Sequence, residues 1–429
     1  MAQPTRKVGT AFMARKETLD GALQHTREWF GALLTRWESA PPNASNDATF
    51  WREDEGAFYL RGVDDEEYAR CLENLATVVG RTDAMEKEAV AQALQTALFT
   101  VVDIPGKRST EPKARIEDAI RELRRALTGP LLRFQVYIPV SGLDPVGLPT
   151  RVGTVDFAVF EESFLLRFPQ GEAELRSESE VFGRTVAITE VEALEWGGAQ
   201  TRGVQVVRLV VDSLNFFSDM VRYNQAHLIL PGDAPKARLV IAQRRLEAGM
   251  DARWRLSHGW VGGQGQLSLT RLREADARQS MGFPRVEDLL GRKRNKLEDQ
   301  LIASIQWAGR ATVAARREEA FLLYAIALES FVLADQDPLE LGYRLRLRVA
   351  HLLGKTPEAR KGLFDQVAQL YAIRSKIVHS GEYRVSEVDL GRMRWICKAA
   401  LLRACTSEDF DRMSTAEDLQ RWFQDRLLD

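Results

Sequence analysis

Apolar residues recur at close to the helical period of 3.6 through the first third of the chain. The first such stretch, 19–37, contains Leu19, Leu23, Phe30, Leu33, Leu34 and Trp37. Similar stretches follow at 64–79, 85–101 and 116–127. The last one runs into Thr128-Gly129-Pro130, a typical helix stop. We therefore predict a helical N-terminal region over residues 1–130.

The pattern changes period in the middle of the chain. Stretches rich in β-branched and aromatic residues predict strands, the clearest at 134–140, 152–160 and 164–168, with weaker ones at 186–188, 227–230, 238–241 and 266–269. Segment 190–220 is long and apolar, which favours a helix, although its β-branched residues leave a strand open. We predict an α+β middle domain over 131–275, for which a sensing or regulatory role is an expectation.

The helical period returns from Val286 onward. The clearest stripe is Phe321, Ala325, Leu328 and Val332 within 316–333. Further helices are predicted at 340–353, 358–378, 386–404 and 415–428. The chain is therefore predicted to be multidomain α+β, with a C-terminal all-α bundle over 286–429.

Composition narrows the class of protein. Hydrophobic residues make up 45% of the chain and charged residues 28%, which is typical of globular domains. No apolar run approaches the ~18–20 residues of a membrane span, and residues 1–16 lack the apolar core of a signal peptide. Cys71, Cys397 and Cys405 form no C-x-x-C pair. We expect a cytoplasmic protein with no disulfides, no metal site and no cofactor.

One candidate phosphate loop is rejected on spacing. Leu353-Gly354-Lys355-Thr356 resembles the end of a Walker loop, but Val349 stands where the first glycine would be. The histidines outside the motif described next show no metal-ligand spacing and are predicted to be structural: His25, His227, His258 and His351.

Charge is unevenly distributed along the chain. The net charge is −2, but residues 341–403 contain thirteen Lys and Arg against five Asp and Glu, a balance of +8. One basic segment on an acidic body suits a localised site for a polyanion. Solvated helix faces explain the same charges equally well.

The motif Arg374-Ser375-Lys376-Ile377-Val378-His379 lies in the basic segment. Metal-free RNA cleavage needs a base for the 2′-OH proton, a role that suits histidine. It also needs a cation to hold the phosphate, for which arginine offers a fixed fork. Five residues of regular helix separate two side chains by about 140° and about 7.5 Å. Either the helix unwinds before His379, or two copies of the chain meet to complete a site.

Three segments in order resemble the HEPN superfamily, specifically the ApeA-like HEPN domains: 321–330, 343–354 and 370–381. The resemblance covers about a quarter of the chain. It implies a bundle of four to five helices that dimerises, with a composite metal-independent ribonuclease site in the dimer cleft. Arg374 and His379 take the catalytic roles in that site. Family members commonly have glycine directly after the histidine, whereas this chain has Ser380 and then Gly381.

The same resemblance suggests supporting residues. It implies that Glu329 supports the motif arginine, although an edge-of-face glutamate is equally expected. Arg348 is expected to contact RNA or, more readily, to pair with Glu329, because buried charges need partners. Tyr371 is expected to be core or to support the site. Expected RNA contacts are Lys376, Arg344 and Arg346.

We therefore expect a HEPN-type endoribonuclease acting on RNA as a homodimer, in the manner of prokaryotic antiphage or toxin effectors. The two preceding regions would hold the activity in check or recognise a phage-derived trigger. Two alternatives stay open. One is a non-catalytic HEPN module for dimerisation or RNA binding, against which the retained Arg374 and His379 count. The other is a toxin kept silent by a partner protein.

Overall fold

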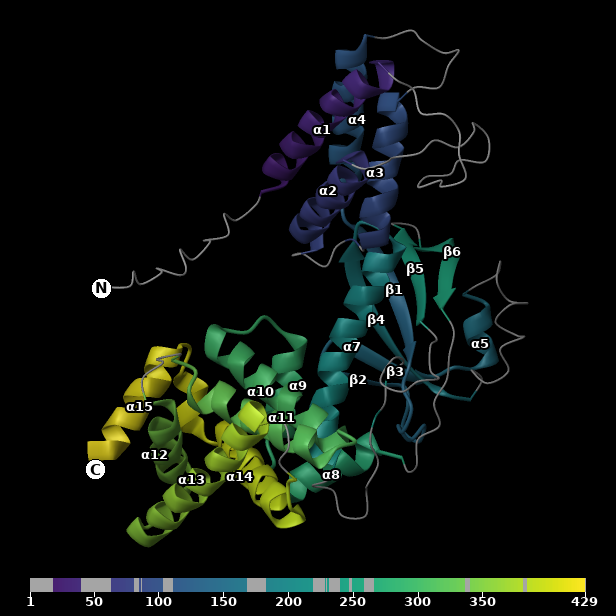
Figure 1. Cartoon of the computed structure of the whole chain (residues 1–429). Helices are drawn as coiled ribbons and strands as arrows, with labels where there is room; N and C mark the ends of the chain where they lie inside the picture. The colour runs from purple at the N-terminus through teal and green to yellow at the C-terminus, as the bar shows by residue number, and fades with distance from the viewer. Residues whose placement is uncertain are drawn as a thin grey trace, which may run out of the picture. The chain divides into compact units, whose positions relative to one another are not determined.

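The computed structural model describes residues 18–39, 63–80, 85, 87–102, 111–167, 183–218, 228, 230, 240–246, 249–257, 266–335, 340–380 and 384–428 (Figure 1). By contacts, the chain divides into two compact units, 1–134 with 191–202 and 135–190 with 203–429. The second unit contains both the strand-rich segments of the middle region and the C-terminal segments. The finer boundaries at 1–130, 131–275 and 286–429 stay a prediction.

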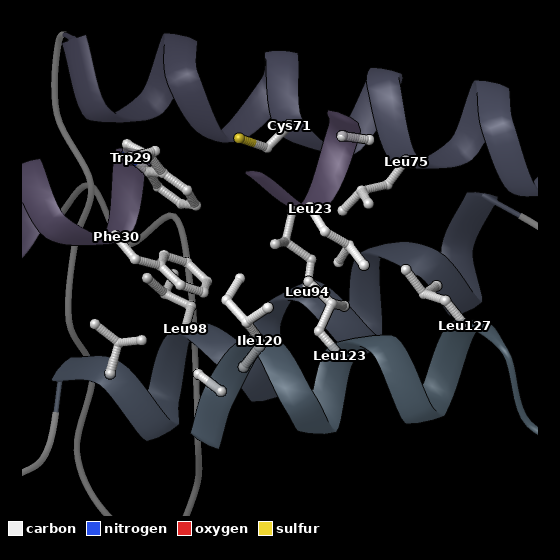
Figure 2. Packing of buried hydrophobic residues seen from close by; sticks show 14 of the residues in the cluster. Leu23, Trp29, Phe30, Cys71, Leu75, Leu94, Leu98, Ile120, Leu123 and Leu127 are labelled. Atoms are coloured by element: carbon white, nitrogen blue, oxygen red, sulfur yellow. The ribbon is translucent and has the colours of Figure 1, made fainter. Parts of the chain in front are cut away.

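Among the described residues, four helices make up the N-terminal part, as the apolar period predicts: α1 (Leu19–Ser39), α2 (Val63–Gly80), α3 (Lys87–Val102) and α4 (Pro112–Leu127). Their buried faces form one apolar cluster, in which Trp29 and Phe30 of α1 lie with ring centroids 5.1 Å apart. Figure 2 shows these rings pointing toward Leu98 and Ile120 between the helices. Because every helix contributes apolar residues to one cluster, burial of these faces stabilises the bundle.

The middle of the chain forms a sheet of order β2-β3-β4-β1-β5-β6. Its strands are β1 (Leu132–Pro139), β2 (Thr150–Val152), β3 (Val155–Val159), β4 (Thr185–Ala193), β5 (Val240–Leu246) and β6 (Gly249–Ser257). The pairs β2–β3, β3–β4 and β5–β6 are antiparallel. Helix α7 (Trp196–Ser218) packs closely on β1, since a Cβ at Gly203 would lie 2.7 Å from Val136.

Several predictions for this middle segment are wrong in detail. Segment 152–160 is not one strand, because it turns at Gly153, whose φ is +58°. Segment 164–168 is not a strand: residues Glu162–Leu165 form the short helix α5, and Phe164 stacks on Phe160 at 5.3 Å. A short apolar run does not distinguish a strand from a buried helical turn.

Two further predictions for this segment differ from the structure. Residues 190–193, predicted as helix, complete β4, and the predicted helix begins only at Trp196. Segment 266–269 is not a strand either. Leu267 makes one isolated bridge to Leu143, and Ser268 caps α8 (Leu269–Gln279) by accepting from the Arg271 N–H. Positions 227, 229, 238–239 and 258 lie outside the described residues, among them His227 and His258.

The described residues of the C-terminal part are mainly helical, as predicted. Its helices are α8, α9 (Phe283–Gly291), α10 (Lys296–Val313), α11 (Arg317–Val332), α12 (Leu341–Leu353), α13 (Pro357–Ser380), α14 (Glu387–Thr406) and α15 (Ala416–Leu428), with a 3₁₀ turn η1 (Glu408–Arg412) before the last. A capping box at Asn295 and Glu298 starts α10. None of the described helices is long and apolar enough to cross a bilayer.

Polar contacts join these helices to the second unit's other elements. The Asp212 carboxylate of α7 lies 3.0 Å from Nε of Arg310 in α10. Lys398 of α14 is buried and donates to the Phe216 carbonyl at 2.7 Å. Gly309 permits the closest approach, because a Cβ there would overlap the Asp212 backbone. The C-terminal helices are therefore built onto α7.

Candidate active site

Helix α13 carries both residues of the motif and stays helical through Ser380. The alternative in which the helix unwinds before His379 is therefore wrong. His379 is exposed, whereas Arg374 is half-buried, as expected for positions about 140° apart around a regular helix. The two side chains of one copy lie on different faces of α13 and do not converge.

Arg374 reaches inward to Glu329 of α11. Its Nη2 donates to Oε2 of Glu329 at 3.3 Å, and its Nε lies 3.1 Å from Oε1. The second contact is electrostatic only, because these two atoms are not aligned for a hydrogen bond. The structure thus brings together two residues that the resemblance singles out, and the guanidinium is fixed to α11.

This pair lies against an apolar cavity of about 10 Å³, close to the smallest size that holds a water molecule. Residues of four helices line it: Ala325, Leu328, Leu345, Val367, Leu370, Tyr371, Met393 and Ile396, with Glu329 and Arg374 themselves. Burial raises the pKa of the Glu329 carboxyl above its usual range, and the charge of Arg374 opposes that rise only in part. The pair therefore sits in surroundings that disfavour the ionised carboxylate.

Arg348 does not pair with Glu329, which corrects the expected pairing. Its Nη1 and Nη2 lie 3.2 Å and 2.7 Å from the two oxygens of Asp335, just beyond the end of α11. Nη1 also donates to the Val332 carbonyl at 2.9 Å, and the guanidinium lies 5.1 Å from the Phe423 ring. Arg348 therefore caps α11 and fixes α12 against it.

Arg344, expected to contact RNA, also pairs with Asp335. Burial raises the pKa of Asp335, but hydrogen bonds and charge from Arg348 and Arg344 outweigh it, so the net pKa is below the usual range. The sequence predictions do not include Asp335. One feature of the sequence could have indicated this pairing: Asp335 precedes a helix with an arginine at every second position from 344 to 348.

The other candidates occupy different surroundings. Arg346 lies over the Phe364 ring at 4.8 Å and donates Nε to the Gly342 carbonyl. Tyr371 is half-buried one turn before Arg374, with the guanidinium at 6.0 Å from its ring, the outer limit for a cation–π contact. Lys376 is exposed on α13. Their roles as RNA contacts or supports stay predictions.

Fewer of the basic residues in 341–403 are available to a polyanion than the sequence suggests. Among the basic residues of 341–403, Arg344 and Arg348 face Asp335, Arg374 faces Glu329, and Lys398 faces a buried carbonyl. Among the side chains that the structure describes, no group of three or more His, Cys, Asp or Glu has the arrangement of a metal site.

Comparisons of the chain with protein-family models, with curated proteins and with solved structures found no match.

Proposed function

We propose that this chain is a metal-independent endoribonuclease of the HEPN type, whose active site forms between two copies. The observation that carries the proposal is the continuity of α13 through both motif residues, with Arg374 anchored by Glu329 and His379 exposed. One copy cannot bring the two side chains to one phosphate. Two α13 helices that meet at their C-terminal ends can supply Arg374 from one copy and His379 from the other.

In this site, His379 takes the proton of the RNA 2′-OH as that oxygen attacks the adjacent phosphorus. The bond from phosphorus to the 5′-oxygen breaks, leaving a 2′,3′-cyclic phosphate and a 5′-oxygen that takes a proton from water to become the 5′-hydroxyl. Arg374 holds the phosphate oxygens as negative charge develops. The requirement for a 2′-OH selects RNA over DNA.

An exposed apolar strip supports pairing of two copies. Trp395 and Val388 of α14 are 57% and 61% exposed, and Val378 of α13 is 52% exposed. Residues seven apart on a helix share a face, so Val388 and Trp395 lie on the same side of α14. Met393, two residues before Trp395, faces the cavity beside Arg374, so Trp395 points away from that cavity. We assign association to the strip of Val388 and Trp395, because clustered exposed apolar side chains mark such surfaces.

The first experiment measures cleavage of total RNA with EDTA present by wild type, Arg374→Ala and His379→Ala. We expect each substitution to reduce cleavage by about 10²-fold or more, because each removes a catalytic group. Arg421→Ala on α15 and His25→Ala on α1 are matched controls and should cut like wild type. The proposal fails if wild type cuts no RNA under any trigger or if the motif variants cut equally well. Loss of cleavage with EDTA would instead point to a metal.

A mixing experiment tests the composite site. Arg374→Ala and His379→Ala proteins, each inactive alone, form mixed dimers that contain one intact pair. We expect the mixture to recover part of the wild-type activity. No recovery, with mixed dimers demonstrated by mass, would mean that the site forms within one copy.

The strip is tested by Trp395→Glu, with Leu166→Glu as the control, since Leu166 is 84% exposed elsewhere in the chain. Trp395→Glu should shift sedimentation toward the monomer and reduce cleavage, whereas the control should do neither. An unchanged dimer in both variants would show that the interface lies on another surface.

A non-catalytic HEPN module is the second candidate. The contact that favours it is the Glu329–Arg374 pair, which partly neutralises the arginine that a phosphate would need. Equal RNA affinity in wild type and the motif variants, without cleavage, would select this alternative.

The cellular part of the proposal is an antiphage or toxin effector in a prokaryotic cytoplasm, released by a phage-derived trigger or by loss of a silencing partner. It rests on the resemblance alone. The cysteines support a reducing compartment: all three are buried free thiols, and burial raises the pKa of Cys71 to about 11 and those of Cys397 and Cys405 to about 12.

A further inference from the structure

A second basic site lies at the other end of α13. A cleft of about 810 Å³ opens between the α8–α9 turn, the α12–α13 turn, the C-terminal half of α14, and α15. This volume falls within the ~300–1,000 Å³ of small-molecule sites. Arg360 in its wall and His379 in the motif are nineteen residues apart on one helix, or about 28 Å along its axis. The cleft is therefore separate from the candidate active site.

Two glycines shape the cleft walls. Gly282, at φ +81°, brings the α8–α9 turn against α14, since a Cβ there would lie 2.6 Å from Cβ of Cys405. Arg285 fixes the same wall by donating to the Ala404 and Phe410 carbonyls at 2.9 Å and 3.2 Å. At the opposite wall, a Cβ on Gly354 would lie 2.8 Å from Cγ of Arg360, so glycine lets that side chain cross the α12–α13 turn.

The lining is strongly basic. Lys355, Arg360, Arg403 and Arg426 contribute four positive charges, and the described lining contains no Asp or Glu. Arg426 is partly neutralised from outside the lining by Asp409, at 3.2 Å, whereas the other three cations face no carboxylate among the described residues. Like charges gathered in a concave wall focus a positive potential that attracts anions.

His351 lines the cleft and is half-buried. Burial lowers the pKa of its ring, the charges of Arg360 and Arg426 lower it further, and a hydrogen bond with the Arg426 backbone opposes these effects. Anionic oxygens in the cleft would favour the imidazolium, because an opposite charge stabilises it. The His351 ring is therefore a reporter for an anion bound in this cleft.

We propose that this cleft binds a small anion that carries a chain of two or more phosphate groups. Four cations drawn from the α12–α13 turn, α13, α14 and α15 exceed what one phosphate needs, and arginine forks suit phosphate oxygens. Apolar side chains beside the cations, including Met281, Leu352 and Leu402, leave room for an organic group on the same anion. The source is therefore an inorganic polyphosphate or a nucleoside polyphosphate. The site does not depend on the proposed nuclease activity.

The test is calorimetric titration of the full chain, without divalent cations, with tripolyphosphate, ATP and orthophosphate. We expect tripolyphosphate and ATP to bind at least ten-fold more tightly than orthophosphate. ATP binding well above tripolyphosphate would identify a nucleotide as the source, and equal binding an inorganic chain. The proposal is overturned if neither binds with a dissociation constant below about 1 mM.

Paired variants place the binding. Lys355→Gln with Arg403→Gln removes two exposed cleft cations, and we expect at least ten-fold weaker binding. Lys361→Gln with Arg392→Gln removes two exposed cations of α13 and α14 that lie outside the lining, and this variant should bind like wild type. Equal losses in both pairs would show diffuse electrostatics and overturn the site.

Two further readouts separate this proposal from an RNA groove. Saturating tripolyphosphate should shift the ring resonances of His351 and leave those of His25, on α1, unchanged; no shift at His351 overturns the location. A single-stranded oligonucleotide that binds through Lys355 and Arg403, while tripolyphosphate does not bind, would overturn the small-anion proposal in favour of RNA.

Discussion

Two carboxylate–arginine pairs at the end of α11 differ in what surrounds them. Glu329 faces Arg374 alone beside an apolar cavity, and burial raises its pKa. Asp335, six residues later, is only 7% exposed, but Arg348 and Arg344 both approach it and lower its pKa. The first pair leaves its carboxylate poorly compensated. The second compensates its carboxylate fully and links α11 to α12.

The difference separates a positioning contact from a structural one. Arg348 is 8% exposed and is bound to Asp335 and to the Val332 carbonyl, so its charge is committed to the fold. Arg374 is 28% exposed, and one carboxylate holds it. An arginine held by a single, weakly ionising partner can still present its fork to a phosphate.

Removing the Asp335 carboxylate should destabilise the fold most. Asp335→Ala removes the acid that the buried Arg348 guanidinium contacts, and loss of one partner of a buried ion pair costs about 3–5 kcal/mol. Urea unfolding measures the change. Asp288→Ala is the matched control, because that acid is 61% exposed beside Arg292, and it should change the free energy of unfolding by less than about 1 kcal/mol. Similar values for both variants would contradict a structural role for Asp335.

Neutralising Glu329 should affect cleavage more than stability. Glu329→Gln keeps the shape but loses the charge that orients Arg374, so RNA cleavage should fall about ten-fold through misplacement of the guanidinium. The free energy of unfolding should change by less than about 1 kcal/mol. The substitution loses the ion pair with Arg374, but it also removes the cost of burying a poorly compensated carboxylate, and the two effects offset each other. Cleavage and urea unfolding are measured together. A loss of stability as large as that of Asp335→Ala would place both pairs in the same structural class.

The two carboxylates should respond to pH with opposite sign. The pKa of Glu329 is raised above the ordinary 4.5, so the native state retains its proton longer and the stability from this group is lost as pH rises from 4.5. The pKa of Asp335 is lowered below the ordinary 3.8, so its contribution is present above 3.8 and is lost as pH falls through the native pKa.

Unfolding of wild type, Glu329→Gln and Asp335→Asn across acidic to neutral pH measures these contributions. Relative to Glu329→Gln, wild type should become less stable toward neutral pH. Relative to Asp335→Asn, it should lose its advantage below pH 3.8. Curves that stay parallel in both comparisons would show that neither carboxyl is perturbed by folding.

Arg346 should show the smallest effect. It lies between Arg344 and Arg348 on α12, but its partners are the Phe364 and Tyr343 rings, at 4.8 Å and 5.7 Å, and not a carboxylate. Arg346→Met keeps the apolar stem and loses only the cation–π contacts. The free energy of unfolding should therefore fall by about 0.5–1 kcal/mol. A cost comparable to that of Asp335→Ala would point to a buried partner for this guanidinium.

The candidate site was predictable where it depends on one helix. The spacing of Arg374 and His379 already indicated that a regular helix separates them, and α13 runs on through Ser380. The partner of Arg348 was not predictable. Glu329 and Asp335 both stand near the end of α11, and the choice between them depends on how α12 packs against that end. The cleft beyond Arg360 was missed as well, because its cations come from four separate places in the sequence.

The sequence alone predicted most of the helices, though not α5 or α8, since an apolar stripe at the 3.6-residue period requires no partner to be recognised. It also predicted the strand β1 and the helix α7, although it placed the start of that helix before Trp196. Tertiary structure decided the turn at Gly153, the capping of α8 at Ser268, and which acid meets which arginine. The physical reason is the distance along the chain between the residues that determine each feature. Periodicity is a property of neighbouring residues, whereas ion pairs and concave surfaces are selected by the packing of elements that lie far apart along the chain.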